Sequence, residues 1–313
     1  MINKAWVDLY RPNTLSECIL TDELYNKFYS FVRTESIPNL ILVGPSGIGK
    51  TSVAVAMLKD LDCDYYKVNA SIKGIDLIRD EVMQFCSTVS FVGKKKYVIF
   101  DEADGLSVAA QDALKTFIEE YANNAGFIFT CNSLNKLIPA IQSRNMIINF
   151  VVSKNDFPTL AKNFYKKVET ILNENNVVFE KQVIGPVIKK FFPDWRKILI
   201  VLQEYAITHN NIIDNGILGN KDLDTLDELI GFIKSKQWEN ARKWVGENND
   251  CYVDFASFLR KLYDEIKGLL QSSSLPVLTV RMNEFDFQHY FVADKENNVI
   301  AFITKIMTEI VFK

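Results

Sequence analysis

The sequence predicts an α/β domain built on a parallel sheet, followed by a small helical lid domain and an all-helical C-terminal domain. Short apolar runs alternate with amphipathic stretches between residues 38 and 150, which is typical of strands covered by helices. A glycine-rich turn follows the first of these runs, and strand signals nearly vanish after Phe150, where helical periodicity takes over. The chain has 313 residues, 48% of them hydrophobic, so it can bury two or three cores.

Five apolar runs are the expected strands of the sheet. They lie at residues 40–43, 65–68, 97–100, 127–131 and 146–150. Between the third and the fourth run, Ala110, Leu114 and Phe117 fall on one helical stripe, which predicts an amphipathic helix over residues 108–121.

The turn from Gly44 to Thr51 fits the phosphate-binding pattern G-x-x-x-x-G-K-[ST]. A strand that feeds such a turn and then a helix surrounds an anion with backbone N–H groups and the positive end of a helix dipole. Lys50 is expected to reach the β- and γ-phosphates, and Thr51 to offer its hydroxyl to Mg²⁺. The nucleotide-binding residues expected here are Gly44, Pro45, Ser46, Gly47, Ile48, Gly49, Lys50, Thr51 and Ser52.

Two carboxylates, Asp101 and Glu102, follow the apolar run 97–100 directly. The carboxyl ends of parallel strands are where an α/β sheet presents its site. We expect Asp101 to hold Mg²⁺ through water, and Glu102 to orient or deprotonate the attacking water. A simpler alternative stays open, in which both acids only cap the next helix.

Three polar residues further along are candidates for contact with the γ-phosphate. Asn132 follows the fourth strand and would hydrogen-bond the phosphate or the attacking water. Arg144 would face outward from its own nucleotide, as an arginine finger for a neighbouring subunit, while Arg196 would reach back to its own. Alone, Asn132 could equally shape a turn, and either arginine could form a surface salt bridge.

Helical periodicity after Phe150 predicts the two helical domains. Lid helices are expected near 157–172, 181–192 and 195–208, with Asp194 as N-cap of the third, and C-terminal helices at 226–233, 238–245, 252–270 and 297–311. The Asn- and Gly-rich stretch 210–221 is expected to be a linker. We place the domains at residues 1–152, 153–220 and 221–313.

Composition excludes several classes of protein. A net charge of −3 argues against a broad basic surface, so any contact with DNA would use a few lysines, arginines and helix N-termini. Five scattered cysteines and two histidines make a zinc site or a disulfide framework improbable. Apolar runs fall short of the ~18 residues needed to cross a bilayer, and the start lacks an apolar leader. We therefore expect a cytoplasmic protein without membrane contact, in the host-cell cytoplasm if it is encoded by a phage.

Five motifs follow one another along the chain: Trp6-Val7-x-x-Tyr10-Arg11-Pro12, the P-loop, Asp101-Glu102-Ala103-Asp104, Ser143-Arg144 and Phe192-Pro193-Asp194-Trp195-Arg196-Lys197. Their order resembles that of the AAA+ sliding-clamp loaders. The chain is similar to replication factor C small subunits and most similar to the large, ATPase subunit of T-even-type bacteriophage clamp loaders. One departure is Asn145, where the family's usual Ser-Arg-Cys has cysteine.

This resemblance implies an AAA+ ATPase domain, a lid and a C-terminal collar, with four copies of the chain joined to one smaller subunit in a spiral. ATP binding would assemble the spiral and open the ring-shaped clamp, and primer-template DNA would trigger hydrolysis and release. ATP would lie between subunits, with Tyr10, Arg11 and Pro12 near the adenine. Asn132 would be the sensor on its strand, Arg144 the finger in trans, and Arg196 the sensor on the lid.

The resemblance also implies surfaces for DNA and for the clamp. Helices that open near Ser71 and Ser107 would line the inside of the spiral, and the candidates for phosphate contact are Lys73, Arg79, Gln111 and Lys115. Lys73 matches a family position that pairs with the catalytic glutamate until DNA draws it away. Phe85 and Phe91 are candidates for gripping the clamp. Solvated helix faces and core aromatics are the simpler alternatives.

Three other functions stay open. Another AAA+ motor, such as a helicase loader or branch-migration subunit, would lack the Tyr-Arg-Pro start and the collar. A DEAD-box helicase would need a second motor domain. A scaffold that binds ATP without hydrolysing it is disfavoured by intact Lys50, Asp101, Glu102 and Arg144.

Overall fold

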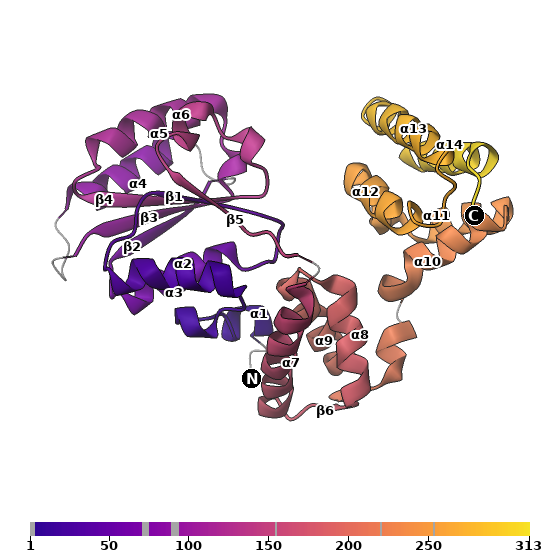
Figure 1. The fold of residues 1–313 in the computed structure, drawn as a ribbon, viewed down its shortest axis with the longest axis horizontal. Coiled ribbons are helices and arrows are strands. Elements are labelled where there is room, and N and C mark those ends of the chain that lie inside the picture. Colours follow the sequence, from indigo (N-terminus) through magenta and orange to yellow (C-terminus); the bar gives the residue numbers. More distant parts are fainter. Residues whose placement is uncertain (1–3, 71–74, 89–93, 154, 220, 253) are drawn as a thin grey trace. The chain divides into compact units, whose positions relative to one another are not determined.

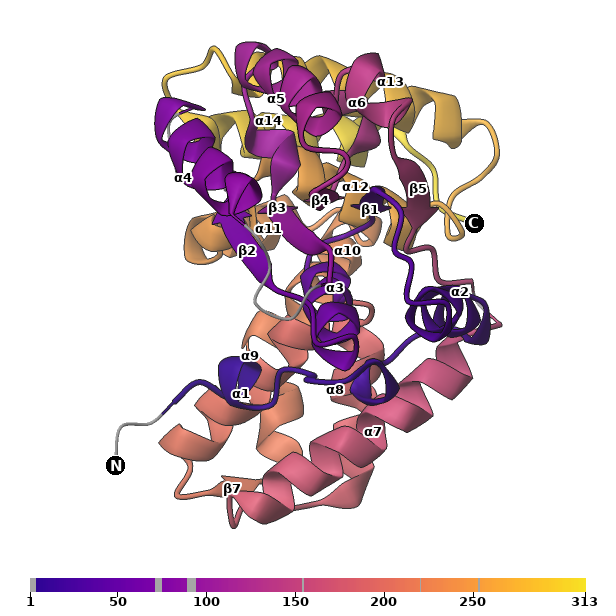
Figure 2. The same ribbon diagram turned by 90° about the vertical axis from the view of Figure 1, so that its left-hand side faces the viewer.

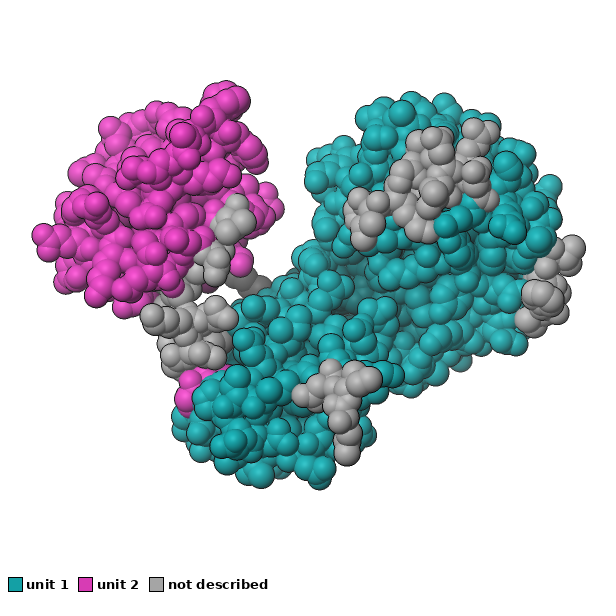
Figure 3. Space-filling model, turned by 180° about the vertical axis from the view of Figure 1, so that it is seen from behind, with its two compact units in different colours: residues 1–215 teal, residues 216–313 magenta. Residues whose placement is uncertain are grey.

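The computed structural model describes residues 4–70, 75–88, 94–153, 155–219, 221–252 and 254–313. The chain divides into two compact units, residues 1–215 and residues 216–313, coloured separately in Figure 3. The first unit contains the sheet and the lid helices, and the described residues of the second are helical apart from one isolated antiparallel bridge between Leu270 and Phe312.

A five-stranded parallel sheet organises the first unit, in the order β2-β3-β4-β1-β5. Since β4 lies between β1 and β3, the chain segments that leave these three strands meet at one edge of the sheet. The strands are β1 (Leu40–Val43), β2 (Tyr65–Asn69), β3 (Lys96–Asp101), β4 (Ala125–Cys131) and β5 (Met146–Asn149).

Helices cover both faces of this sheet, with α2 and α3 on one face and α4, α5 and α6 on the other (Figures 1 and 2). Alternate residues of β3 enter the two cores: Ile99 packs on the α2 and α3 side, and Phe100 on the opposite side. Both are fully buried, which explains why residues 97–100 of the strand form one continuous apolar run and do not alternate with polar residues. These helices are α2 (Asp22–Arg33), α3 (Lys50–Asp60), α4 (Ile75–Ser87), α5 (Val108–Glu120) and α6 (Pro139–Gln142).

The lid part of the first unit consists of α7 (Phe157–Glu174), α8 (Lys181–Phe191) and α9 (Trp195–Thr208). Asp194 caps α9 as predicted, because its Oδ1 accepts a hydrogen bond of 2.9 Å from the Lys197 N–H. The short helix α1 (Trp6–Leu9) contacts α9 through a 2.8 Å bond from the Trp6 N–H to Gln203 Oε1. Two parallel strands, β6 (Val178–Phe179) and β7 (Ile212–Ile213), were not predicted, because two residues are too short to show alternation.

The described residues of the second unit form a bundle of five α-helices around a core of their own. They are α10 (Lys221–Lys234), α11 (Trp238–Glu247), α12 (Phe255–Ile266), α13 (Ser274–His289) and α14 (Lys295–Glu309). Helix α13 was not predicted, because its apolar residues do not form one stripe: Leu278 is buried, while Val280 and Phe287 are exposed. Short 3₁₀ turns occur at Leu15–Glu17, Ala103–Gly105, Leu134–Lys136, Asn215–Gly219 and Asn249–Tyr252.

The predicted fold class is confirmed: a parallel α/β domain, a helical lid and an all-helical C-terminal region. The predicted linker 210–221 contains β7 and a 3₁₀ turn, and the division between the two compact units falls inside it, after Asn215. The predicted domain boundaries at 152 and 220 stay predictions. Among the residues described, no helix combines the length and apolar character needed to span a membrane.

Candidate functional site

The loop after β1 has a backbone that requires glycine at two positions, with φ of +74° at Gly47 and +103° at Gly49. Lys50 begins α3, and its ammonium returns to the loop, where Nζ donates to the carbonyl oxygens of Gly44 at 2.6 Å and Pro45 at 2.8 Å. Burial lowers the pKa of Lys50. The buried Lys50 ammonium therefore forms its hydrogen bonds to this loop with uncharged carbonyl oxygens.

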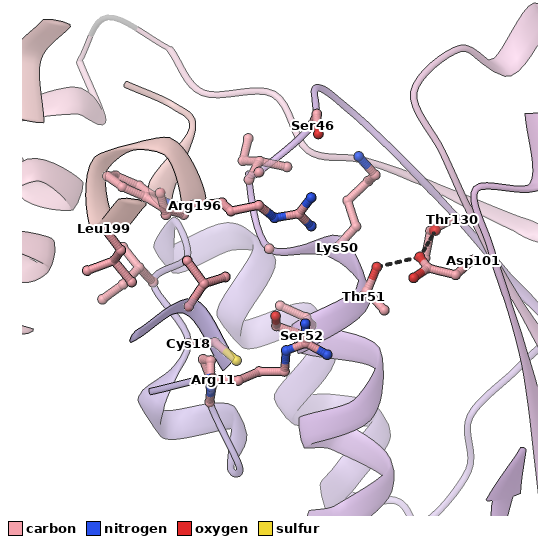
Figure 4. A pocket seen from close by; sticks show the side chains of 18 of the residues that line it. Arg11, Cys18, Ser46, Lys50, Thr51, Ser52, Asp101, Thr130, Arg196 and Leu199 are labelled. Carbon is pink, nitrogen blue, oxygen red and sulfur yellow. Dashed lines mark hydrogen bonds between the residues drawn. The ribbon is translucent and has the colours of Figure 1, made fainter. Parts of the chain in front are cut away.

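Asp101, at the end of β3, lies opposite the start of α3. Its Oδ1 accepts from Thr51 Oγ1 at 2.6 Å and from Thr130 Oγ1 at 2.7 Å, as drawn in Figure 4, and its Oδ2 pairs with Lys67 Nζ at 2.8 Å. Burial alone would raise the pKa of Asp101, but the hydrogen bonds from Lys67, Thr51 and Thr130 bring it below its usual value. A fixed, ionised carboxylate beside the P-loop threonine is a suitable ligand environment for Mg²⁺.

Glu102 has a backbone conformation that is unusual for a residue with a side chain. Its φ of 56° and ψ of 45° lie in the left-handed region, and its N–H donates to Thr130 Oγ1 at 3.2 Å. Such conformations cost of order 1–3 kcal/mol and cluster at functional sites. The exposed Glu102 side chain lines the same pocket as Asp101.

Asn132 reaches the P-loop through the strand order. Lys50 Nζ donates to its Oδ1 at 3.0 Å, because β4 is the direct neighbour of β1. The structure thus brings Asn132 beside the P-loop lysine, and its role toward a phosphate stays a prediction.

An open pocket, about 1150 Å³ with the solvent at its mouth included, joins the P-loop to the N-terminal segment and to the lid. Tyr10, Arg11 and Pro12 line it from the N-terminal segment, and Arg196 extends into it from α9 (Figure 4). The Tyr10 hydroxyl accepts from Asn175 Nδ2 at 2.8 Å, and burial raises the pKa of Tyr10, so the phenol is neutral. Backbone N–H groups, cationic side chains and apolar side chains that converge on one open pocket suit a nucleotide.

Arg144 lies elsewhere, exposed ahead of β5. Its Nε donates to Glu119 Oε1 at 2.7 Å and its Nη1 to the Ala140 carbonyl at 2.8 Å. The guanidinium therefore pairs with α5 of its own chain, and the predicted contact with a neighbour's phosphate stays a prediction.

The prediction of a direct contact between Gln111 and DNA is wrong, because only 1% of the residue is exposed. Its Nε2 donates to the carbonyls of Leu106 at 3.1 Å and Lys136 at 3.0 Å, while its Oε1 accepts from the Ile138 N–H at 2.8 Å. The amide thus fastens α5 to the segment before α6. The sequence placed Gln111 on the polar side of the helix, and could not show that this segment covers it.

The other DNA candidates have mixed outcomes. Lys115 is 38% exposed at its side chain and lies 3.8 Å from Asp112, so it is open to a phosphate. Lys73 lies outside the described residues, as does the side chain of Arg79, whose backbone belongs to α4.

Of the two aromatics predicted to grip a clamp, Phe85 is half-buried. Its ring contacts that of Tyr66 with centroids 5.7 Å apart, and Lys96 Nζ lies 4.8 Å from its centroid. Phe85 is therefore partly a core residue, and its clamp role stays a prediction. Phe91 lies outside the described residues.

Two site residues, Lys67 and Thr130, were missed from the sequence. Both lie inside strands and not at strand ends, where the search concentrated. Strand alternation would have placed Thr130 on the same side of β4 as Asn132, and Lys67 on the same side of β2 as Asn69. Both side chains contact Asp101.

Two family models match this chain. One, described as ATPase family associated with various cellular activities (AAA), covers residues 40–152. The other, described as the AAA+ ATPase lid domain of the sliding-clamp-loader large subunit, covers residues 156–219.

Curated relatives align along nearly the whole chain. The sliding-clamp-loader large subunit of Escherichia phage RB69 is 30% identical, with 97% of this chain and 96% of the relative covered. The protein of the same name from Enterobacteria phage T4 is 29% identical, with the same coverage. A replication factor C small subunit from Sulfolobus acidocaldarius is 28% identical over 96% of this chain and 95% of its own length.

Among solved structures, the RuvB Holliday junction branch migration motor of Thermotoga maritima has a similar fold. Its TM-score is 0.54 at 16% identity, over 73% of this chain and 80% of that chain. A mutant form of the same protein gives a TM-score of 0.55 at 15% identity, over 72% and 81%. At these identities the similarity concerns the fold alone.

Proposed function

The chain belongs to the sliding-clamp-loader large subunits, a family of AAA+ ATPases, and on this premise we propose how its pocket binds ATP with Mg²⁺ and hydrolyses it. As a member of this family it is an ATPase that acts in clamp loading during DNA replication. The observation that carries the proposal is the buried ammonium of Lys50, 8% exposed, with hydrogen bonds to three uncharged oxygens. A buried cation without a hydrogen-bonded anion is costly, and a phosphate relieves that cost.

The residues of the pocket divide between binding and reaction. The loop from Gly44 to Ser52 holds the phosphates, and Tyr10, Arg11 and Pro12 lie near the adenine. Thr51 and Asp101 would hold Mg²⁺, Asp101 through water, and the bound ion would offset the charge of the phosphates. Both residues fit the ion, because they already share a 2.6 Å hydrogen bond on one side of the pocket.

Hydrolysis needs a positioned water and a stabilised γ-phosphate. The carboxylate of Glu102 accepts a proton from the attacking water and orients it. Asn132, adjacent to Lys50 in the pocket, contacts the γ-phosphate, as does Arg196 from the lid. Arg144 acts on the γ-phosphate of a neighbouring subunit, which its exposed position outside its own P-loop supports.

The partners of this reaction are copies of the chain, four in number, with one smaller loader subunit, a ring-shaped clamp and primer-template DNA. Lys73, Arg79 and Lys115 contact DNA phosphates, and Phe85 and Phe91 contact the clamp. The protein works in the cytoplasm, where the replicating DNA is.

Steady-state ATP hydrolysis tests the proposal directly. The chain is mixed with the smaller loader subunit from its own genome, with and without primer-template DNA and the cognate clamp. We expect DNA and clamp together to stimulate hydrolysis, and Glu102→Gln or Arg144→Ala to abolish this stimulation. In Arg144→Ala the rate of hydrolysis should fall by up to about 10³-fold. Arg33→Ala, at an exposed arginine of α2, is the matched control and should keep full activity. Hydrolysis indifferent to both ligands would indicate another AAA+ motor, and none at all would indicate an ATP-bound scaffold.

A mixing experiment tests whether the site is shared. We expect assemblies of Glu102→Gln subunits alone, or of Arg144→Ala subunits alone, to lack the stimulation. A mixed assembly contains interfaces with an intact Glu102 on one side and an intact Arg144 on the other. We expect mixing to restore part of the activity. If mixing restores nothing, Arg144 acts within its own subunit through Glu119 and the shared site is refuted.

A further inference from the structure

Lys67 occupies an unusual place in the sheet. It lies in the middle of β2, one of the two edge strands. Its side chain is on the same side of β2 as Tyr65, which packs against the core that contains α3. The register pairs Lys67 with Ile99, so Asp101 lies two residues further along β3 on the same side. The lysine side chain spans that diagonal, and its Nζ lies 2.8 Å from Asp101 Oδ2.

A lysine on an edge strand commonly points into solvent, where it discourages pairing with another sheet. Lys67 instead turns its ammonium toward the pocket that it lines, and its side chain is 34% exposed against 16% for Asp101. Oδ1 of Asp101 is taken by the hydroxyls of Thr51 and Thr130. Among the described residues that bond to this carboxylate, Lys67 therefore supplies the positive charge.

We propose that Lys67 is a positioning residue of the ATP site, which shares Asp101 with Mg²⁺ and thereby weakens the binding of the ion. The inference rests on the proposed role of Asp101 as a ligand of Mg²⁺ through water. An ammonium in hydrogen-bond contact with this carboxylate lies within several ångströms of any cation held through it, and like charges repel at that distance. Lys67 fixes the orientation of Asp101 and at the same time makes the metal easier to release.

The test compares nucleotide affinity with and without metal. The dissociation constant of a fluorescent ATP analogue is measured in saturating Mg²⁺ and in EDTA, and the ratio of the two affinities gives the contribution of the ion. This ratio does not depend on turnover. Dividing the two affinities also removes any general loss of nucleotide binding that a structural change would cause.

Lys67→Met removes the charge and keeps the length of the side chain, so the Mg²⁺ contribution should rise roughly three- to tenfold. Lys67→Gln should act in the same direction, and serves if the Met variant is unstable. Lys67→Arg keeps the charge and should stay within about twofold of the unmodified chain. Lys59→Met is the control, because Lys59 Nζ bonds the neutral Asn13 Oδ1 at 2.7 Å. An unchanged or smaller Mg²⁺ contribution in the Met and Gln variants overturns the inference.

Asp101→Asn separates this inference from the proposed function. If Asp101 is a ligand of Mg²⁺ through water, this variant lowers the Mg²⁺ contribution. No change in Asp101→Asn would refute the metal assignment itself, and the inference with it. A loss in Asp101→Asn without a gain in Lys67→Met would refute only the role of Lys67.

Discussion

Replacing Gly47 by alanine should destabilise the first unit through a specific contact with the lid. A Cβ on Gly47 would lie 1.8 Å from Asp194 Oδ1 and 2.3 Å from its Cγ, so the carboxylate must move. That carboxylate caps α9 through its 2.9 Å bond from the Lys197 N–H, and losing such a cap costs about 1 kcal/mol. The left-handed backbone at φ +74° adds about 1–2 kcal/mol for a residue with a side chain. Together, Gly47→Ala should cost about 2–3 kcal/mol.

The two contributions separate in a double-mutant cycle. In an Asp194→Ala background the cap is already lost and the clash is gone, so Gly47→Ala should cost only the backbone strain, about 1–2 kcal/mol. The coupling between the two sites is then about 1 kcal/mol. Gly49→Ala is the matched control: its φ is +103°, but nothing lies within 4 Å of its added Cβ, so its cost should be equal in both backgrounds.

Hydrogen–deuterium exchange as a function of urea measures these free energies, because peptides from residues 1–215 report the first unit separately from the second. The four variants of the cycle and the two Gly49→Ala variants are compared under identical conditions. An equal cost for Gly47→Ala in both backgrounds would show that the Asp194 carboxylate does not limit this position, and the reasoning would be refuted.

Three further predictions concern stability. Gly126→Ala places a Cβ 2.4 Å from the buried Tyr97 ring and should cost about 1–3 kcal/mol in denaturant unfolding, whereas Gly185→Ala, with open space in α8, should be neutral or stabilising. Gln111→Ala leaves two carbonyls and one N–H without their partner and should lower stability by about 1–3 kcal/mol, read as a lower Tm. Burial and, to a smaller extent, the charge of Lys295 lower the pKa of His289, while Asp286 acts in the opposite direction. The unfolded chain therefore binds the proton more readily than the folded chain does. The stability of the second unit should therefore be complete above about pH 6.5 and fall below it, and His289→Phe should flatten this dependence; equal pH profiles would contradict the assignment.

Local patterns explain what the sequence could predict. The apolar runs, the P-loop and the two acids at the end of β3 are each identified by residues within a short stretch of sequence. The predicted strand ends lie within two residues of those in the structure. The cap of α9 by Asp194 is equally local. What escaped prediction depends on distant partners. The helical pattern placed Gln111 on the exposed side of its helix, but the segment 136–138 covers it in the structure. Helix α13 has no single apolar stripe, because some of its hydrophobic side chains are exposed.

Strand order decides the chemistry of the site more than any one motif does. The P-loop and Asp101 leave strands that are not neighbours, and β4 fills the place between them. From β4, Thr130 bonds both the Asp101 carboxylate and the Glu102 N–H, while Asn132 bonds the Lys50 ammonium. Strand β4 and the residue that follows it thus position the proposed metal ligand, the proposed base and the proposed phosphate-binding lysine. The sequence of β4 is that of an ordinary buried strand, yet it sets the geometry of three proposed functional groups. None of the sequence motifs alone predicts this arrangement.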